Sequence, residues 1–237
     1  MPNPYFSFKQ FTVYHDKCAM KVGIDGVLLG AWAEVGNASR ILDIGTGAGL
    51  IALMLAQRSS STIVGIDIEP DAVQQARENV LQSPWTNRVE VLQCSLQEFA
   101  KTSSTGFDLI VSNPPYFVNS LKAPTENRSL ARHTETLTHW ELIENASGLL
   151  NPDGRISLIL PVNEGLQCID FASENDLFCS KLTKVFPKPG KDVKRVLIEF
   201  TKVPTDKVEA ELIIESEVRH HYSPEFTALA KDFYLKL

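Results

Sequence analysis

Apolar segments typical of buried strands alternate with helical segments through the middle of the chain, and this alternation constrains the fold more than any other feature. The segments we predict are strands at residues 40–44, 62–67, 89–93 and 107–111 and helices at residues 50–57 and 71–81. Strands that alternate with helices form a largely parallel, doubly wound sheet. The strands are rich in Ile, Leu and Val, which suits a sheet covered by helices on both faces.

The rest of the chain adds elements on both sides of this pattern. Residues 5–14 alternate aromatic and polar side chains, which predicts a hairpin, and Asp25 is a candidate N-cap for the helix that follows. Downstream we predict helices at residues 140–149, 163–175 and 224–234, and strands at residues 155–160, 182–186 and 193–201. The sequence therefore predicts an α/β fold with a doubly wound, mostly parallel, Rossmann-like sheet of seven strands, including an antiparallel edge strand.

Size and composition narrow the class of protein. The chain has 237 residues, 43% of them hydrophobic, so we expect one domain over residues 1–237, with an N-terminal extension (1–38) packed on the ligand site of a core (39–237). No apolar run approaches the roughly 20 residues of a membrane span, and no secretory signal is evident. We therefore expect a cytoplasmic protein, and a monomer. The net charge of −6 argues against nonspecific binding to nucleic acid.

The four cysteines, Cys18, Cys94, Cys168 and Cys179, are far apart and form no CxxC pair. This pattern predicts free thiols in a reducing compartment. The histidines have no Cys or carboxylate neighbours at metal-binding spacing, so we expect no metal.

A glycine-rich loop follows the first strand of the alternating pattern. Gly45, Gly47 and Gly49 allow a tight turn and a close approach of the backbone to a ligand. Dinucleotide dehydrogenases share such loops, but Asp43 would repel a pyrophosphate and attract an ammonium group. S-adenosylmethionine carries an ammonium and no phosphate, so it is the predicted cofactor. Asp67, at the end of the next strand, can accept hydrogen bonds from both ribose hydroxyls; as an alternative, it caps the helix that follows.

The tetrapeptide Asn113-Pro114-Pro115-Tyr116 follows the strand at residues 107–111. The Asn113 side-chain carbonyl and the Pro114 backbone carbonyl can both accept hydrogen bonds from one planar amine. The prolines stiffen the turn and add no N–H donors, and the Tyr116 ring can stack on the group that carries the amine. We interpret this tetrapeptide as the catalytic element for methylation of an exocyclic or amide nitrogen, with a plain turn as the alternative.

Two basic groups are candidates for contact with RNA phosphates. They are Arg128, Arg132 and His133, after the tetrapeptide, and Lys188, Lys191, Lys194 and Arg195, around the turn at residues 187–190. The alternative is that both groups are simply solvated. A base within a nucleic acid must leave its stack to enter such a pocket, which agrees with a stacking role for Tyr116.

These motifs together resemble the class I S-adenosylmethionine-dependent N-methyltransferases. Further motifs are similar to the bacterial tRNA1(Val) (adenine(37)-N6)-methyltransferases: residues 21–30, Arg128 to His133, Pro189-Gly190-Lys191, and residues 222–226 with 232–234. The resemblance covers nearly the whole chain. It implies methylation of the adenine beside the anticodon of valine tRNA, without metal.

The resemblance also implies roles for further residues. Lys21 and Gly23 would lie near the methionine end of the cofactor, and Ile68, Ser95 and Leu96 would complete its binding site. One position departs from the family, because Ser95 stands where an Asp often contacts the cofactor's adenine amine. A hydroxyl is a weaker partner for that amine than a carboxylate.

Several other functions remain open from the residues alone. The same tetrapeptide serves methylation of a glutamine amide in a protein, although the protein-methylating family normally carries an additional N-terminal helical domain. Methylation of a guanine amine in ribosomal RNA is a nearer alternative. An RNA-binding protein without catalysis would not need Asp43, Asp67 or Asn113, and Asp43 disfavours an NAD-dependent oxidoreductase.

Overall fold

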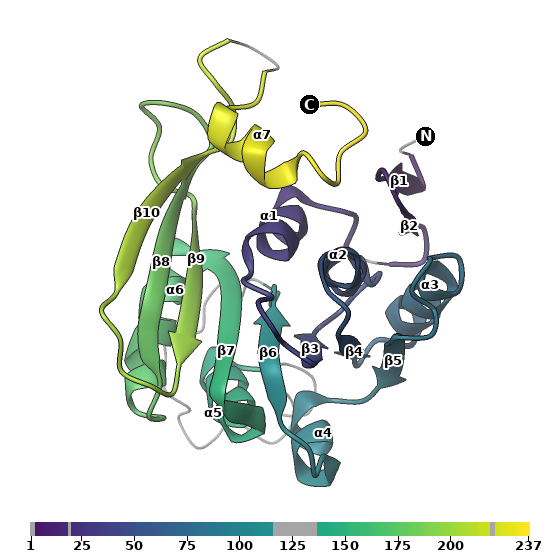
Figure 1. The fold of residues 1–237 in the computed structure, drawn as a ribbon, viewed down its shortest axis with the longest axis vertical. Coiled ribbons are helices and arrows are strands. Elements are labelled where there is room, and N and C mark those ends of the chain that lie inside the picture. The colour runs from purple at the N-terminus through teal and green to yellow at the C-terminus, as the bar shows by residue number, and fades with distance from the viewer. Residues whose placement is uncertain (1–2, 19, 116–136, 219–220) are drawn as a thin grey trace, which may run out of the picture.

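The computed structural model describes residues 3–18, 20–115, 137–218 and 221–237, and its centre is one large twisted sheet with helices on both faces (Figure 1). The strands of this sheet are β3 (Arg40–Ile44), β4 (Thr62–Asp67), β5 (Val89–Gln93), β6 (Phe107–Ser112), β7 (Leu150–Pro161), β8 (Phe178–Phe186), β9 (Arg195–Thr201) and β10 (Val208–Ile213). Their order is β10-β8-β9-β7-β6-β3-β4-β5, and β9 alone runs antiparallel to its neighbours β7 and β8. The predicted doubly wound, mostly parallel α/β fold is confirmed.

The predicted count of seven strands is wrong, because the described residues form an eight-stranded sheet. The additional strand is β10, which pairs in parallel with β8. Five of its six residues are exposed or half-buried, and only Leu212 is buried. An exposed edge strand needs few apolar side chains, so its sequence gives little strand signal. The predicted antiparallel strand is confirmed as β9, which pairs with β8 next to the edge strand β10.

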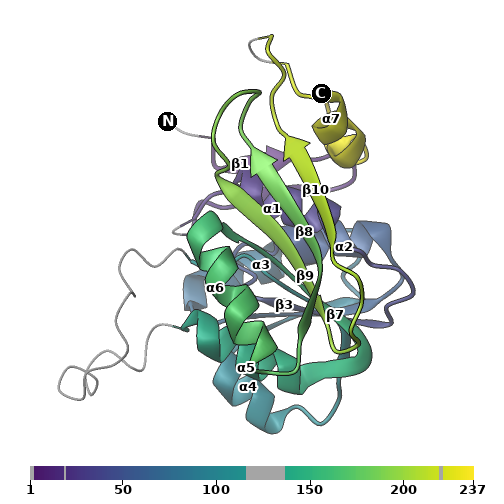
Figure 2. The same cartoon turned by 90° about the vertical axis from the view of Figure 1, so that its left-hand side faces the viewer.

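Two apolar cores lie on opposite faces of the sheet. Helices α1 (Ile24–Trp32), α2 (Leu50–Arg58), α3 (Pro70–Leu81) and α7 (Pro224–Ala230) lie on one face, and α4 (Leu96–Thr102), α5 (His139–Leu149) and α6 (Val162–Ser173) on the other (Figures 1 and 2). Alternate side chains of a strand point to opposite faces. In β3, Ile41 therefore enters the first core and Leu42 the second.

Three of the helices, α4, α5 and α7, begin at a residue whose side chain caps the helix. Ser223 caps α7 by accepting a hydrogen bond from the backbone N–H of Phe226 at 2.9 Å, and Ser95 caps α4 within a capping box. The prediction of Asp25 as an N-cap is wrong: the cap of α1 is Gly23, and Asp25 lies in the first turn. The Asp25 carboxylate instead pairs with the distant Arg195 at 2.9 Å, a tertiary contact that sequence spacing does not reveal.

The N-terminal hairpin joins the core instead of standing apart from it. Strands β1 (Tyr5–Ser7) and β2 (Thr12–Tyr14) pair antiparallel, as predicted. Phe8 and Phe11 at the turn are buried in the core that contains α1 and α2. The Lys9 N–H donates to the Phe233 carbonyl at 2.8 Å, so the two chain ends lie side by side. Across the described residues, no helix has the length and apolar character that a membrane crossing requires.

Candidate functional site

The carboxyl ends of four parallel strands bring the predicted cofactor and catalytic residues to one edge of the sheet. Ile44 of β3 pairs with Ser112 of β6 and with Ile66 of β4, and β5 continues the register on the far side of β4. The residues that follow these strands are therefore neighbours. Ligands of doubly wound sheets bind at this edge, beside the point where the strand order reverses.

The glycine-rich loop has backbone angles that glycine adopts readily. Gly45, Gly47 and Gly49 have φ angles of 70°, 55° and 82°. A Cβ atom would have nothing within 4 Å at Gly45 or Gly47, whereas at Gly49 it would meet the Ala76 side chain at 3.4 Å. The first two glycines thus present open backbone to a ligand, and the third allows close packing of α3 on the loop.

Asp43 lies fully buried beneath the loop. Its Oδ2 accepts hydrogen bonds from Thr46 Oγ1 at 2.7 Å and from the Ala52 backbone N–H at 3.1 Å. Burial raises its pKa from 3.8 to about 7, although both hydrogen bonds oppose that rise, and the nearby Asp67 charge adds to it. Its Oδ1 is buried and accepts no hydrogen bond from the described residues, which leaves acceptor capacity beneath the loop.

Asp67 fixes the loop from the neighbouring strand. Its Oδ2 accepts a hydrogen bond from the Gly47 N–H at 2.8 Å, and its Oδ1 accepts one from the Glu69 N–H at 3.0 Å. The alternative of Asp67 as a helix cap is not realised, because the cap residue of α3 is Glu69. The adjacent Ile68 side chain is 48% exposed and offers an apolar surface at the same edge.

Ser95 is engaged in the capping box of α4. Its hydroxyl accepts from the Glu98 N–H at 3.2 Å and donates to the Glu98 carboxylate at 2.9 Å, while Leu96 is buried. Hydrogen bonds from the Ser95 backbone and side chain lower the pKa of Glu98. The family's acidic position is thus neutral here, but a carboxylate lies one helical turn away. Cys94 and Glu98 also line a cavity of about 730 Å³ beside β5.

Asn113 follows β6 directly beside the glycine-rich loop. The preceding Ser112 hydroxyl donates to the Ile44 carbonyl at 2.8 Å, which ties the end of β6 to the end of β3. The Asn113 Oδ1 is buried and accepts no hydrogen bond from the described residues. Pro114 is buried and Pro115 is exposed. A buried carbonyl oxygen without a donor is uncommon in proteins and is suited to receive one from a ligand.

Four of the predicted site residues, Tyr116, Arg128, Arg132 and His133, lie outside the described residues.

The basic hairpin tip, residues 187–194 between β8 and β9, lies at this same edge. Arg195 pairs with Pro161 at the carboxyl end of β7, which places the tip beside the ends of the parallel strands. Lys188 pairs with Glu215 at 2.8 Å, and Arg195 with Asp25, whereas Lys191 and Lys194 are exposed. The ion pair between Arg195 and Asp25 also places the start of α1 near this edge. The exposed Lys21 and Gly23 directly precede that helix.

The sequence patterns missed two polar residues that organise the site. Thr46 donates its hydroxyl to Asp43, and Asn79 of α3 is fully buried and donates to the Ala48 carbonyl at 2.8 Å. The available signal for Asn79 was a polar residue between the apolar positions of a helix face. Among the described residues, no three His, Cys, Asp or Glu side chains are placed to hold a metal ion. The four cysteine thiols are free, and burial raises the pKa of Cys18 to about 11.

The fold and this edge define the chain as a methyltransferase: the family model for a methyltransferase domain matches residues 36–203. A structure described as a predicted O-methyltransferase from Agrobacterium tumefaciens has the same fold, with a TM-score of 0.67 at 21% identity, covering 88% of this chain and 96% of that one. Proteins of Parabacteroides distasonis and Phocaeicola vulgatus, both named tRNA1(Val) (adenine(37)-N6)-methyltransferase, are 53% and 54% identical over the full length of both chains. The chain belongs to the family of tRNA1(Val) (adenine(37)-N6)-methyltransferases.

Proposed function

We propose that this protein transfers a methyl group from S-adenosylmethionine to the N6 amine of adenine 37 in valine tRNA. The observation that carries the proposal is the buried Asn113 Oδ1 at the end of β6 beside the glycine-rich loop, which receives no hydrogen-bond donor from the described residues. An adenine amine would supply that donor. The identity of the nucleotide comes from the names of the full-length relatives.

The described residues fit the cofactor at this edge. S-adenosylmethionine would supply an electrophilic methyl group. The open backbone at Gly45 and Gly47 allows the cofactor to approach closely. The Asp43 Oδ1, which accepts no hydrogen bond from the described residues, can accept one from an ammonium group. Asp67 can accept hydrogen bonds from ribose hydroxyls through its remaining lone pairs. Other residues that we assign to the cofactor are Lys21 and Gly23 toward the methionine end, Gly49 at the loop, and Ile68, Ser95 and Leu96 toward the adenine.

The tetrapeptide would hold the target amine in the reactive orientation. Asn113 Oδ1 and the Pro114 carbonyl would each accept one amine hydrogen, Pro115 would keep the turn stiff, and Tyr116 would stack on the flipped base. As the new N–C bond formed, the bond between the methyl group and the sulfonium sulfur would break and leave S-adenosylhomocysteine. Positive charge would develop on the amine nitrogen, which would then lose one proton to water. The negative ends of the two carbonyl dipoles would stabilise that charge. Catalysis would therefore rest on positioning and electrostatics, and we assign no strong base.

The basic hairpin tip would bind tRNA phosphates beside the target nucleotide. Lys191 and Lys194 are exposed there, and the Lys188–Glu215 pair is partly solvated, so all three charges can face a polyanion. We assign the same function to Arg195 at the base of the tip and to Arg128, Arg132 and His133. We further propose that the protein acts as a cytoplasmic monomer.

The test is methyl transfer from labelled S-adenosylmethionine to the tRNA, ribosomal RNA and protein of a bacterial extract, followed by digestion of the RNA to nucleosides. We expect N6-methyladenosine in valine tRNA, and none in a matched valine tRNA transcript with guanine at position 37. Label in protein but not in RNA would refute the proposal in favour of a glutamine-amide methyltransferase. Methylguanine in ribosomal RNA would refute it in favour of the other alternative.

A further inference from the structure

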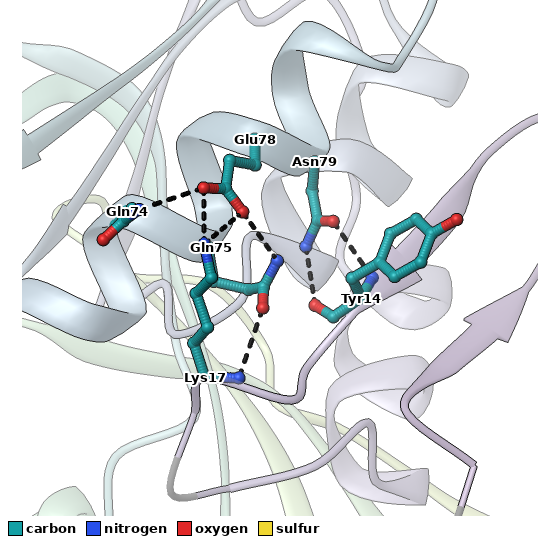
Figure 3. Close-up of polar contacts among 6 residues, drawn as sticks. All are labelled: Tyr14, Lys17, Gln74, Gln75, Glu78 and Asn79. Carbon is teal, nitrogen blue, oxygen red and sulfur yellow. Dashed lines mark hydrogen bonds and ion pairs between the residues drawn. The ribbon is translucent and has the colours of Figure 1, made fainter.

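The segment that follows β2 runs along one face of α3 toward the cofactor edge. Asn79 bonds to the Tyr14 backbone, Gln75 Oε1 accepts from the Lys17 N–H at 3.3 Å, and Glu78 forms an ion pair with Lys17 (Figure 3). The segment therefore runs antiparallel to α3, with residue 14 beside residue 79 and residue 17 beside residue 75. We call residues 14–18 the N-terminal strap.

The strap runs toward the N-terminal end of α3, which follows Asp67 on the ribose side of the predicted cofactor site. Burial raises the pKa of Cys18 to about 11, and the next cause is the negative charge of Asp67, followed by those of Asp16 and Asp71. Cys18 thus lies close enough to Asp67 to feel its charge, just before Lys21 and Gly23.

Asn79 joins the strap to the glycine-rich loop through one side chain. Its Oδ1 accepts from the Tyr14 N–H at 3.0 Å, and its Nδ2 donates to the Tyr14 carbonyl at 2.8 Å and to the Ala48 carbonyl at 2.8 Å. The side chain is fully buried and its two amide hydrogens are both used. Ala76, one turn earlier on the same helix, lies next to Gly49, where an added Cβ atom would meet its side chain at 3.4 Å. One face of α3 therefore touches the loop and holds the strap.

We propose that Asn79 is a positioning residue for cofactor binding, because it fixes the N-terminal strap and the glycine-rich loop to each other. The inference rests on the proposed function only in taking S-adenosylmethionine as the ligand of this edge. Without Asn79, the strap and the loop would have to be ordered separately when ligand binds, and that ordering would cost affinity. Asn79 touches neither reacting group, so turnover with saturating cofactor should be preserved.

Binding of S-adenosylhomocysteine, measured by calorimetry, tests the proposal directly. Asn79→Leu keeps the number and branching of the side-chain heavy atoms and removes all three hydrogen bonds, and we expect it to weaken binding about tenfold or more. Asn79→Ala should do the same. The matched control is Lys17→Met, which removes the solvated strap ion pair without touching the loop and should change affinity less than about twofold.

Hydrogen exchange and turnover separate positioning from simple loss of stability. In ligand-free Asn79→Leu we expect faster exchange at residues 45–49 and at the strap, with kcat for tRNA near the wild-type value at saturating cofactor. Wild-type affinity in both Asn79 variants together with a lowered melting temperature would overturn the inference. If the wild-type protein bound S-adenosylhomocysteine but methylated no tRNA, the proposed function would be refuted and the inference on Asn79 would not be affected.

Discussion

Replacing Asp43 by Asn removes a buried ionisable group while keeping an acceptor oxygen for Thr46 and Ala52. The pKa of Asp43 is raised from 3.8 to about 7 in the folded protein, so the fold favours the protonated form. The stability contributed by that form is complete below pH 3.8 and is lost as the pH rises to about 7. Over that whole interval the loss amounts to about 4 kcal/mol.

The expected signature is a stability difference that changes with pH. Between pH 5 and pH 8, the free energy of unfolding of Asp43→Asn should rise relative to wild type by about 3 kcal/mol. Any cost of burying the new amide group does not depend on pH, so it shifts the difference without changing its slope. All other titrating groups are shared by the two proteins and largely cancel.

Urea unfolding of ligand-free protein at several pH values measures this difference. A control is Thr46→Val, which removes a hydrogen bond that lowers the pKa of Asp43 and should extend the pH dependence of stability to higher pH. Binding of S-adenosylhomocysteine at pH 8 should be weaker in Asp43→Asn by about tenfold, because a neutral acceptor attracts an ammonium less strongly. Parallel stability curves for wild type and Asp43→Asn would refute the reasoning on Asp43.

Three further predictions concern catalysis, substrate and cofactor. Asn113→Ala should retain S-adenosylhomocysteine binding and lose most turnover, by about 100-fold or more; an equal loss of both would make Asn113 structural. Neutralising Lys188, Lys191 and Lys194 together should raise the KM for tRNA and flatten its salt dependence, and an unchanged salt slope would exclude the tip from the interface. Ser95→Asp retains a good helix cap and should tighten cofactor binding in a calorimetric titration; unchanged or weaker binding would count against an adenine contact at this position.

Much of the fold could be predicted because its signals are local. The predicted bounds of β3, β4 and β5 match those in the structure. The strands β3 and β4 are short apolar runs that end at turns, and β5 alternates the buried Val89 and Val91 with exposed residues. Residues 96–102 form the short helix α4, because the Ser95–Glu98 capping box supports helix where the apolar pattern is weak. The exposed β10 escaped prediction for the opposite reason, as its pairing with β8 needs hardly any apolar side chains.

The candidate site also has features that the sequence predicts and features that depend on tertiary structure. By itself, the sequence determined which chemical groups follow each strand: three glycines, Asp43, Asp67 and Asn113, all at strand ends that a parallel sheet must bring to one edge. Only the tertiary structure decided their states, because burial and long-range partners depend on the packed chain. It buried Asp43 and raised its pKa, tied Asp67 to the Gly47 N–H, and paired Asp25 with Arg195 across 170 residues of sequence.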